Sequence, residues 1–196
     1  MPRIDHNKFY YNAYKRYGKT PQALCWKDKH SQKERFLQIS KALPKDLSSF
    51  SLVDCGCGFG DLYHFLQKRN NLPKHYIGIE EQSLFAKIAQ KQTQQKIIVG
   101  DFLQTSLPEA DFYICSGTLN TLTHFESYLF LTKMAQNATQ GVIFNFLSKT
   151  DSDHFNALDP KKVKELLAQL RFDIYFYQEG YIQNDCTIAA QPYHQL

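Results

Sequence analysis

Short apolar runs alternate with segments of helical spacing along most of the chain. The apolar runs, each bounded by turn-forming residues, predict strands at 50–54, 76–80, 97–100, 112–115 and 141–147. Apolar residues that recur every three or four positions predict helices at 31–43, 60–68, 83–94, 126–136 and 160–170. The run 141–147 is almost continuously apolar, which is typical of a central parallel strand covered on both faces.

Two of these helices carry start signals of their own. Ser31 and Glu34 have the spacing of a capping box, so a helix is predicted to begin at Ser31 and to end before Pro44. Asp159 followed by Pro160 predicts a second start, because proline is favoured at the first helical position.

The carboxyl-terminal part of the chain predicts two more strands, 172–177 and 186–190. Parallel neighbours need a dozen or more residues to cross over, and 178–185 is too short for that. The pair should therefore be antiparallel. Strand–helix alternation closed by such a hairpin predicts an α/β fold, a three-layer sandwich around a mostly parallel seven-stranded sheet.

Composition and charge narrow the possible classes of protein. With 196 residues, of which 43% are hydrophobic and 21% charged, the chain is expected to form one domain over 1–196. Its net charge of +4 falls short of the strongly basic balance of nucleic-acid binders. No apolar run approaches the about 20 residues of a membrane span, and 1–15 lacks the apolar core of a signal peptide.

The cysteines favour a reducing compartment. Their number, five, is odd, and their spacing does not match a disulfide framework. Cys55 and Cys57 flank a glycine, but no second Cys or His pair stands at zinc-ligand spacing, so no metal site is predicted. We therefore expect a cytoplasmic protein without a membrane segment.

The strongest chemical signal lies where the first predicted strand turns into a helix. Asp54 is followed there by Gly56, Gly58 and Gly60. Glycine has no Cβ, so the turn can tighten and a ligand can contact backbone N–H groups. A dinucleotide fingerprint needs its third glycine at the position of Asp61. The pattern Asp54-x-Gly56-x-Gly58-x-Gly60 instead resembles the first motif of the class I S-adenosylmethionine-dependent methyltransferases.

Polar residues also end the next predicted strands. Glu80 could accept two hydrogen bonds from a ribose diol, or it could be an ordinary exposed strand end. Asp101 could accept from the exocyclic amine of adenine, and Phe102 could face the purine ring or belong to the core. Ser116 ends the fourth strand. The carboxyl ends of such strands form one edge of an open α/β sheet, where ligands bind.

The resemblance to the class I methyltransferases extends over roughly residues 31–190. The chain is also similar to an uncharacterised bacterial branch that is distantly related to trans-aconitate-type small-molecule methyltransferases. The segments that carry this second resemblance are Tyr17-Gly18, Trp26, Gln32-Lys33-Glu34-Arg35-Phe36, Ser116-Gly117-Thr118-Leu119-Asn120, Asn145-Phe146-Leu147-Ser148 and Asn184-Asp185-Cys186-Thr187. Cys186 departs from the aromatic residue expected at its position.

The resemblance implies a Rossmann-related methyltransferase fold with S-adenosylmethionine as the cofactor. It divides the chain into an amino-terminal helical cap, 1–45, and a cofactor-binding sheet, 46–190. The implied roles are methionine binding by the Gly56 and Gly58 backbone, orientation of that region by Asp54, ribose binding by Glu80, adenine binding by Asp101 and Phe102, and a place beside the sulfonium for Ser116.

Arg35 and Trp26, which precede the glycine turn, are further candidates for the cofactor site. Gln32 and Arg35 share a side of their helix, next to an apolar stripe. An arginine at such a margin snorkels, pairs with an acid, or forms a bidentate pair with the cofactor's carboxylate. Trp26 could pack over the cofactor as part of a lid or simply pack against a helix.

The implied chemistry is methyl transfer to an unidentified small-molecule acceptor by direct in-line displacement. The protein has to align the reactants and exclude water, and it need not supply a nucleophile. The turn 116–120 lacks the Asp/Asn-Pro-Pro-aromatic signature of amino-methylating nucleic-acid enzymes. If a general base is needed, His124 and His154 are candidates, since both follow predicted strands; otherwise they are surface loop residues.

Three other functions are compatible with these patterns. The first is a nicotinamide-dependent oxidoreductase, which Asp61 opposes. The second is a non-catalytic cofactor-binding regulatory or partner protein. The third is an RNA or protein methyltransferase, for which only the mild positive charge speaks. Recognition of the acceptor is expected in the amino-terminal segment and in the loops 118–125 and 149–158.

Overall fold

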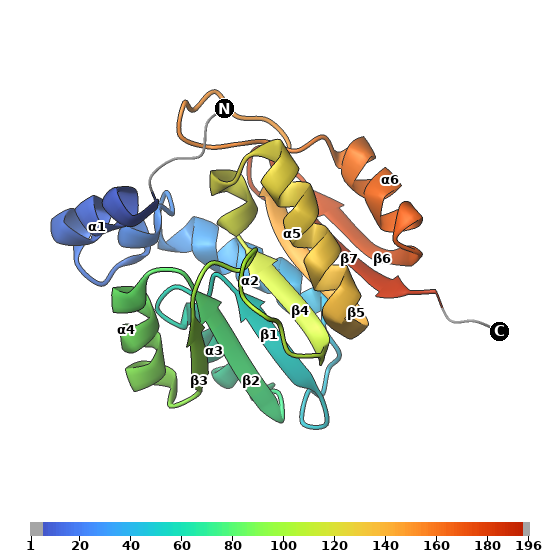
Figure 1. Ribbon diagram of the computed structural model, residues 1–196, viewed down its shortest axis with the longest axis horizontal. Coiled ribbons are helices and arrows are strands. Elements are labelled where there is room, and N and C mark those ends of the chain that lie inside the picture. Colours follow the sequence, from blue (N-terminus) through green and yellow to red (C-terminus); the bar gives the residue numbers. More distant parts are fainter. Residues whose placement is uncertain (1–5, 194–196) are drawn as a thin grey trace.

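A computed structural model describes residues 6–193 of the chain (Figure 1). Within these residues, seven strands form one sheet in the order β3-β2-β1-β4-β5-β7-β6. Their bounds are Ser51–Cys55 (β1), His75–Glu80 (β2), Lys96–Val99 (β3), Ala110–Ser116 (β4), Ala138–Leu147 (β5), Phe172–Glu179 (β6) and Asp185–Pro192 (β7). The pairs from β3 to β5 are parallel, whereas β7 is antiparallel to β5 and β6. The predicted mostly parallel sheet with an antiparallel hairpin is confirmed.

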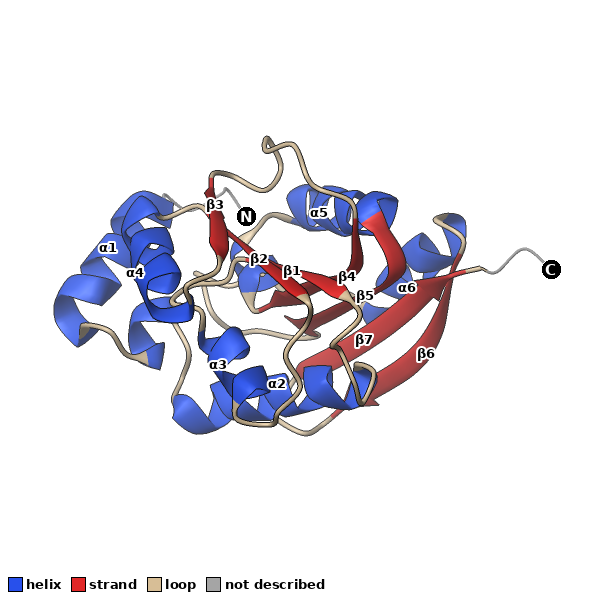
Figure 2. Cartoon of the chain, turned by 90° about the horizontal axis from the view of Figure 1, so that it is seen from below, coloured by secondary structure: helices blue, strands red, loops and turns tan. Residues whose placement is uncertain are grey.

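Helices cover both faces of this sheet. Figure 2 shows α5 on one side of the strands and α2 and α3 on the other, which is the predicted three-layer arrangement. The helix bounds are His6–Tyr17 (α1), Pro21–Leu24 (η1), Lys29–Ala42 (α2), Asp61–Gln67 (α3), Ser83–Thr93 (α4), Thr118–Thr121 (η2), His124–Asn137 (α5) and Pro160–Gln169 (α6). In the part of the chain that the structure describes, no helix is both long enough and apolar enough to cross a membrane.

Two apolar clusters join the helices to the sheet. One cluster packs Phe130 of α5 and Val163 of α6 against the strands, and the other does the same with Ile39 of α2 and Leu62 of α3. The central strand β5 contributes to both clusters, because its successive side chains point to opposite faces and are buried on each. This explains its continuously apolar sequence.

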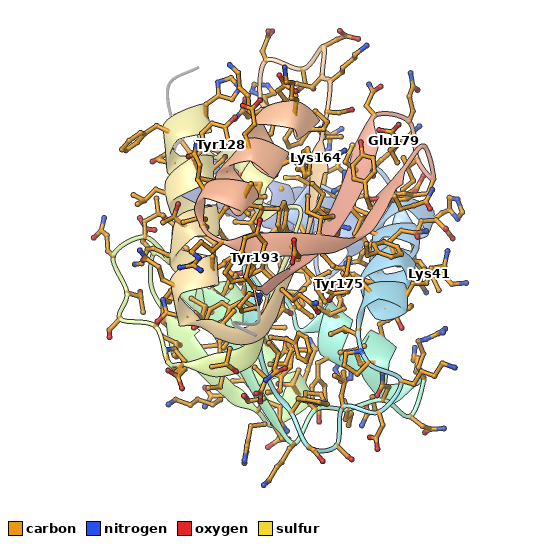
Figure 3. All side chains as sticks on the ribbon, turned by 90° about the vertical axis from the view of Figure 1, so that its right-hand side faces the viewer. Lys41, Tyr128, Lys164, Tyr175, Glu179 and Tyr193 are labelled. Atoms are coloured by element: carbon orange, nitrogen blue, oxygen red, sulfur yellow. The ribbon has the colours of Figure 1, made fainter. Side chains whose placement is uncertain are left out.

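The outer strand β6 is tied to the helical layer by tyrosine. Tyr175, labelled in Figure 3, lies on β6, and its hydroxyl donates to the Ala42 carbonyl at the end of α2 (3.1 Å). Lys164 of α6 places its ammonium 3.6 Å from the ring centre of Tyr177. The hairpin is therefore anchored on both faces of the sheet.

The amino-terminal segment lies over the carboxyl ends of the strands. Tyr14 of α1 packs against Phe59 of the glycine turn, with ring centres 6.0 Å apart, and against Phe85 of α4 at 5.7 Å. Ala23 of η1 is fully buried in the same cluster. These contacts place α1 and η1 at the sheet edge where a ligand is expected.

The start of α2 differs from the prediction. The helix begins at Lys29, and Asp28 is its N-cap: the Asp28 carboxylate accepts from the Ser31 N–H at 2.7 Å, and the Asp28 N–H donates back to the Ser31 hydroxyl. The predicted box of Ser31 and Glu34 is therefore wrong. Both Asp and Ser cap helices well, so the sequence offers two starts, and the earlier one is used.

Candidate functional site

A cavity of about 300 Å³ opens at the carboxyl ends of β1, β2, β4 and β5, with η1 and α2 forming its opposite wall. All nine residues predicted to contact the cofactor line it: Trp26, Arg35, Asp54, Gly56, Gly58, Glu80, Asp101, Phe102 and Ser116. They come from five separate parts of the chain. The fold thus brings the strand-end residues and the cap residues to one place.

The glycine turn between β1 and α3 needs glycine for two reasons. Gly56, Gly58 and Gly60 have φ of +77°, +56° and +83°, a backbone region that other residues rarely adopt. In addition, a Cβ on Gly56 would lie 2.0 Å from the Thr118 Oγ1. The Gly56 N–H donates to the Ile79 carbonyl (2.8 Å), which fixes the turn against β2.

Glu80 holds the glycine turn through its carboxylate. One oxygen accepts from the Gly58 N–H at 2.9 Å and the other from the Gln82 N–H at 2.8 Å. The side chain is buried, and this burial raises the pKa of Glu80 to about 7, although both N–H groups oppose the shift. Glu80 is therefore a buried strand end rather than an exposed one.

Asp54 is a second buried carboxyl group at the neighbouring strand end. The Tyr76 hydroxyl donates to it at 2.6 Å. Burial raises the pKa of Asp54 to about 7, against the lowering effect of the Tyr76 hydrogen bond. Two carboxyl groups that titrate near neutral pH therefore border the same cavity.

Asp101 and Phe102 form the cavity wall beyond β3. Asp101 accepts from the Leu103 N–H at 2.9 Å, which shapes the turn after the strand. Phe102 stacks on Phe130 of α5 with ring centres 3.9 Å apart and is 6% exposed. Phe102 is thus a core residue that also borders the cavity.

Arg35 pairs with an acid, one of the alternatives that the sequence left open. Its Nε donates to one oxygen of Asp185 at 2.7 Å, and its Nη2 donates to the other. The guanidinium carbon lies 4.8 Å from the ring centre of Trp26, whose other contacts include Phe36. Trp26 therefore packs on an arginine and a helix residue while it lines the cavity.

Three polar contacts at the cavity are not predicted by the sequence. One is the pair of Arg35 with Asp185, an acid whose motif implies no role for it. The Gln32 amide donates to the Asp61 carboxylate at 2.9 Å, which links α2 to the glycine turn. The Ser116 hydroxyl donates to the Asn145 side chain at 2.7 Å. Each pair joins residues that are distant in sequence, so local spacing carries no signal for it.

Of the two alternatives for His124 and His154, the structure agrees with the surface position. His124 is the first residue of α5, and its Nε2 is 2.9 Å from the Ala157 carbonyl; His154 contacts Phe9. Both are exposed, and neither lines the cavity. From the loop 149–158, Phe155 reaches the cavity instead.

The cysteines of the glycine turn are buried thiols. Burial raises the pKa of Cys55 and Cys57 well above the usual range for a thiol. Among residues 6–193, no group of three His, Cys, Asp or Glu side chains is arranged to hold a metal ion.

Comparisons with known proteins agree with this geometry. Residues 53–143 match a family model described as a methyltransferase domain. A search of the curated proteins finds no match. Among solved structures, the magnesium protoporphyrin IX methyltransferase of Synechocystis PCC 6803 with bound SAH is similar, with a TM-score of 0.75, 16% identity, and coverage of 95% of this chain and 96% of that one.

Two further solved structures have the same architecture. A TehB-like SAM-dependent methyltransferase from Corynebacterium glutamicum has a TM-score of 0.67 at 14% identity, covering 94% of this chain and 98% of that one. A putative methyltransferase of Haloferax volcanii, solved with the Trm112 activator, has a TM-score of 0.68 at 10% identity with the same coverage, 94% and 98%. Residues 53–143 therefore match a methyltransferase domain, and the described chain has the fold of the class I methyltransferases.

Proposed function

We propose that this protein transfers a methyl group from S-adenosylmethionine to a small-molecule acceptor. The observation that carries the proposal is the convergence of Asp54, Glu80 and Asp101 on one cavity beside the glycine turn. Three acids at the carboxyl ends of neighbouring parallel strands provide acceptors for the donor groups of an adenosyl ligand. The methyltransferase domain match over 53–143 supports the same cofactor.

The residues present fit an adenosyl ligand. Gly56 and Gly58 line the cavity and have no side chains, so a ligand can approach the backbone of the turn there. Gln82 is 9% exposed and lines the cavity next to Glu80, and its Nε2 has no hydrogen-bond partner among the described residues. A buried donor without a partner costs about 1–3 kcal/mol, which a ligand acceptor would recover.

We assign the cofactor roles residue by residue. Glu80 accepts from the ribose hydroxyls, Asp101 accepts from the adenine amine with Phe102 alongside, and Arg35 donates to the carboxylate. The Gly56 and Gly58 backbone and Asp54 hold the methionine part, Ser116 lies beside the sulfur, and Trp26 covers the site from the cap.

The protein promotes the reaction by aligning the acceptor with the methyl group of the cofactor. When bound, S-adenosylmethionine supplies a methyl group on a positively charged sulfur, which is reactive toward a lone pair. The cavity walls hold the acceptor's lone pair in line with that methyl group and exclude water. Alignment of this kind can lower a barrier by about 7–11 kcal/mol, so no protein nucleophile is required.

The shape of the site favours a small acceptor. Beyond Ser116 the cavity is bordered by Leu147, Phe155 and Ile182 and is covered by the amino-terminal segment. These walls enclose apolar surface and fit a compact molecule better than a nucleic-acid backbone.

Titration calorimetry with S-adenosylmethionine and S-adenosylhomocysteine tests the cofactor. We expect both to bind the folded protein and NAD⁺ not to bind. A folded protein that binds neither adenosyl compound would contradict the proposal. Binding without turnover across a broad panel of small acceptors would favour a non-catalytic cofactor-binding protein, and salt-sensitive RNA binding would favour a macromolecular acceptor.

Cofactor affinity should depend on pH through Glu80. Its pKa is about 7 in the free protein, and ribose hydroxyls donate to the ionised carboxylate. Binding therefore favours the charged form and releases a proton, so affinity for S-adenosylhomocysteine should rise as the pH increases through this pKa. Calorimetry in buffers of different ionisation enthalpy measures that proton.

The Glu80→Gln variant is the control for this pH dependence. Asp54 titrates in the same range, so the variant should retain a shallower pH dependence rather than none. An affinity that falls with rising pH in the wild-type protein would refute the assignment of the ionised carboxylate to the ribose.

A further inference from the structure

We propose that Asp185 is a positioning residue for cofactor recognition. It holds the Arg35 guanidinium so that the remaining nitrogen, Nη1, donates to the carboxylate of S-adenosylmethionine. This inference rests on the proposed function and deepens it: the amino-acid end of the cofactor is recognised through a residue of the last strand.

The hydrogen-bonding pattern of Arg35 leaves one nitrogen for a ligand. Asp185 takes the Nε and Nη2 donors, and both side chains are buried. In the described part of the chain, Nη1 makes no hydrogen bond, and it is not among the fully enclosed polar atoms. Because Arg35 lines the cavity, Nη1 is a donor available to a ligand there.

Two neighbours fix the plane of the guanidinium. Trp26 lies against one face, 4.8 Å from its carbon. Gly117 follows Ser116 with φ +84°, and a Cβ there would lie 3.5 Å from Nη1 and 3.1 Å from the Trp26 ring. Nη1 thus lies beside Gly117, the residue after Ser116, to which the sulfur is assigned, so this donor is close to the amino-acid end of the proposed cofactor position.

The charges of the pair indicate that Asp185 acts by orienting Arg35 and not by adding attraction for an anion. Asp185 neutralises the charge of Arg35, so the pair has little net attraction for an anion. An arginine presents its donors in a rigid plane, and two of them pinned by a carboxylate set the direction of the others. A buried ion pair is by itself weak support for a role in stability. Its position on the cavity wall argues for a role in recognition.

The test compares S-adenosylmethionine with its decarboxylated form, which differs only by the missing carboxylate. The Asp185→Asn variant should bind S-adenosylmethionine at least about tenfold more weakly, because the unpinned arginine no longer aims Nη1. Its affinity for the decarboxylated compound should change by less than about twofold. Asp173→Asn is the matched control, since Asp173 is an exposed acid on the adjacent strand β6, and it should leave both affinities unchanged.

A role in charge balance alone makes the opposite prediction. Removing only the negative charge would leave Arg35 more attractive to a carboxylate, so Asp185→Asn would bind S-adenosylmethionine more tightly. The Asp185→Glu variant keeps the charge and shifts the guanidinium, so it should show the same selective loss. It replaces Asp185→Asn in the test if the asparagine variant does not fold. In an Arg35→Gln background, replacing Asp185 should cause no further loss.

Three results would overturn the inference. Equal losses for the two ligands would mean that Asp185 is structural only. Selective loss that persists in the Arg35→Gln background would mean that Asp185 does not act through Arg35. A wild-type protein that binds both ligands equally well would refute recognition of the carboxylate while leaving cofactor use intact; binding of neither ligand would instead refute the proposed function itself.

Discussion

Replacing Gly56 with alanine is expected to weaken binding of S-adenosylhomocysteine by about 100-fold, which corresponds to about 3 kcal/mol. Gly56 has φ +77°, and an added Cβ would lie 2.0 Å from the Thr118 Oγ1 and 3.2 Å from its Cβ. A non-glycine residue in this backbone region costs about 1–3 kcal/mol, and overpacking costs about as much again. The turn can relax only by shifting its backbone, which is held to β2 by the Gly56 N–H bond to Ile79 and the Gly58 N–H bond to Glu80, so the cavity wall should change shape.

The Gly180→Ala variant separates the clash from the backbone strain. Gly180 has φ +75° but nothing within 4 Å of an added Cβ, so this variant carries a similar strain without a contact. It should lose stability modestly and bind normally. Adding Thr118→Ala to Gly56→Ala should recover part of the affinity. Normal binding by Gly56→Ala, measured by calorimetry, would refute the close approach of a ligand to this turn.

The Glu80→Ala variant is expected to lose at least about 100-fold in affinity for S-adenosylhomocysteine and to melt at a lower temperature. It removes the acceptor assigned to the ribose, and it leaves the N–H groups of Gly58 and Gln82 without their partner. Each buried donor left unpaired costs about 1–3 kcal/mol. Calorimetry and a thermal melt measure the two effects separately.

A ligand without the full ribose diol distinguishes binding from folding. If Glu80 holds the ribose, the loss caused by Glu80→Ala should shrink for a 2′-deoxy analogue of S-adenosylhomocysteine. The Glu80→Gln variant keeps one acceptor oxygen and should lie between alanine and wild type. Unchanged affinity in Glu80→Ala would remove the ribose assignment.

The order of elements could be predicted because it depends on local patterns. The continuously apolar sequence of β5 predicts a buried central strand, and the short connection before β7 predicts an antiparallel pair. Each prediction needs only a few neighbouring residues. The start of α2 could not be fixed in this way, since Asp28 and Ser31 are both good caps and only the folded chain selects between them.

The candidate site was predictable where it follows from topology. Glu80 and Ser116 end parallel strands, and the ends of such strands meet at one edge, so their proximity needs no knowledge of loops. The partner of Arg35 was not predictable, because 150 residues separate it from Asp185. The paths of loops are not set by periodicity either, so the sequence leaves His154 as either a candidate base or a surface residue; in the structure Phe155 lines the cavity and His154 does not.

The separation of Arg35 and Asp185 in sequence also affects when their ion pair can form during translation. The chain leaves the ribosome amino terminus first, at about 5–20 residues per second, so the 150 residues between the two take roughly 8–30 s to make. During that time the nascent glycine turn can already exist while the arginine above it has no counterion. The Arg35–Asp185 pair, and with it the proposed recognition of the cofactor's carboxylate, should therefore form only after the last strand has been made.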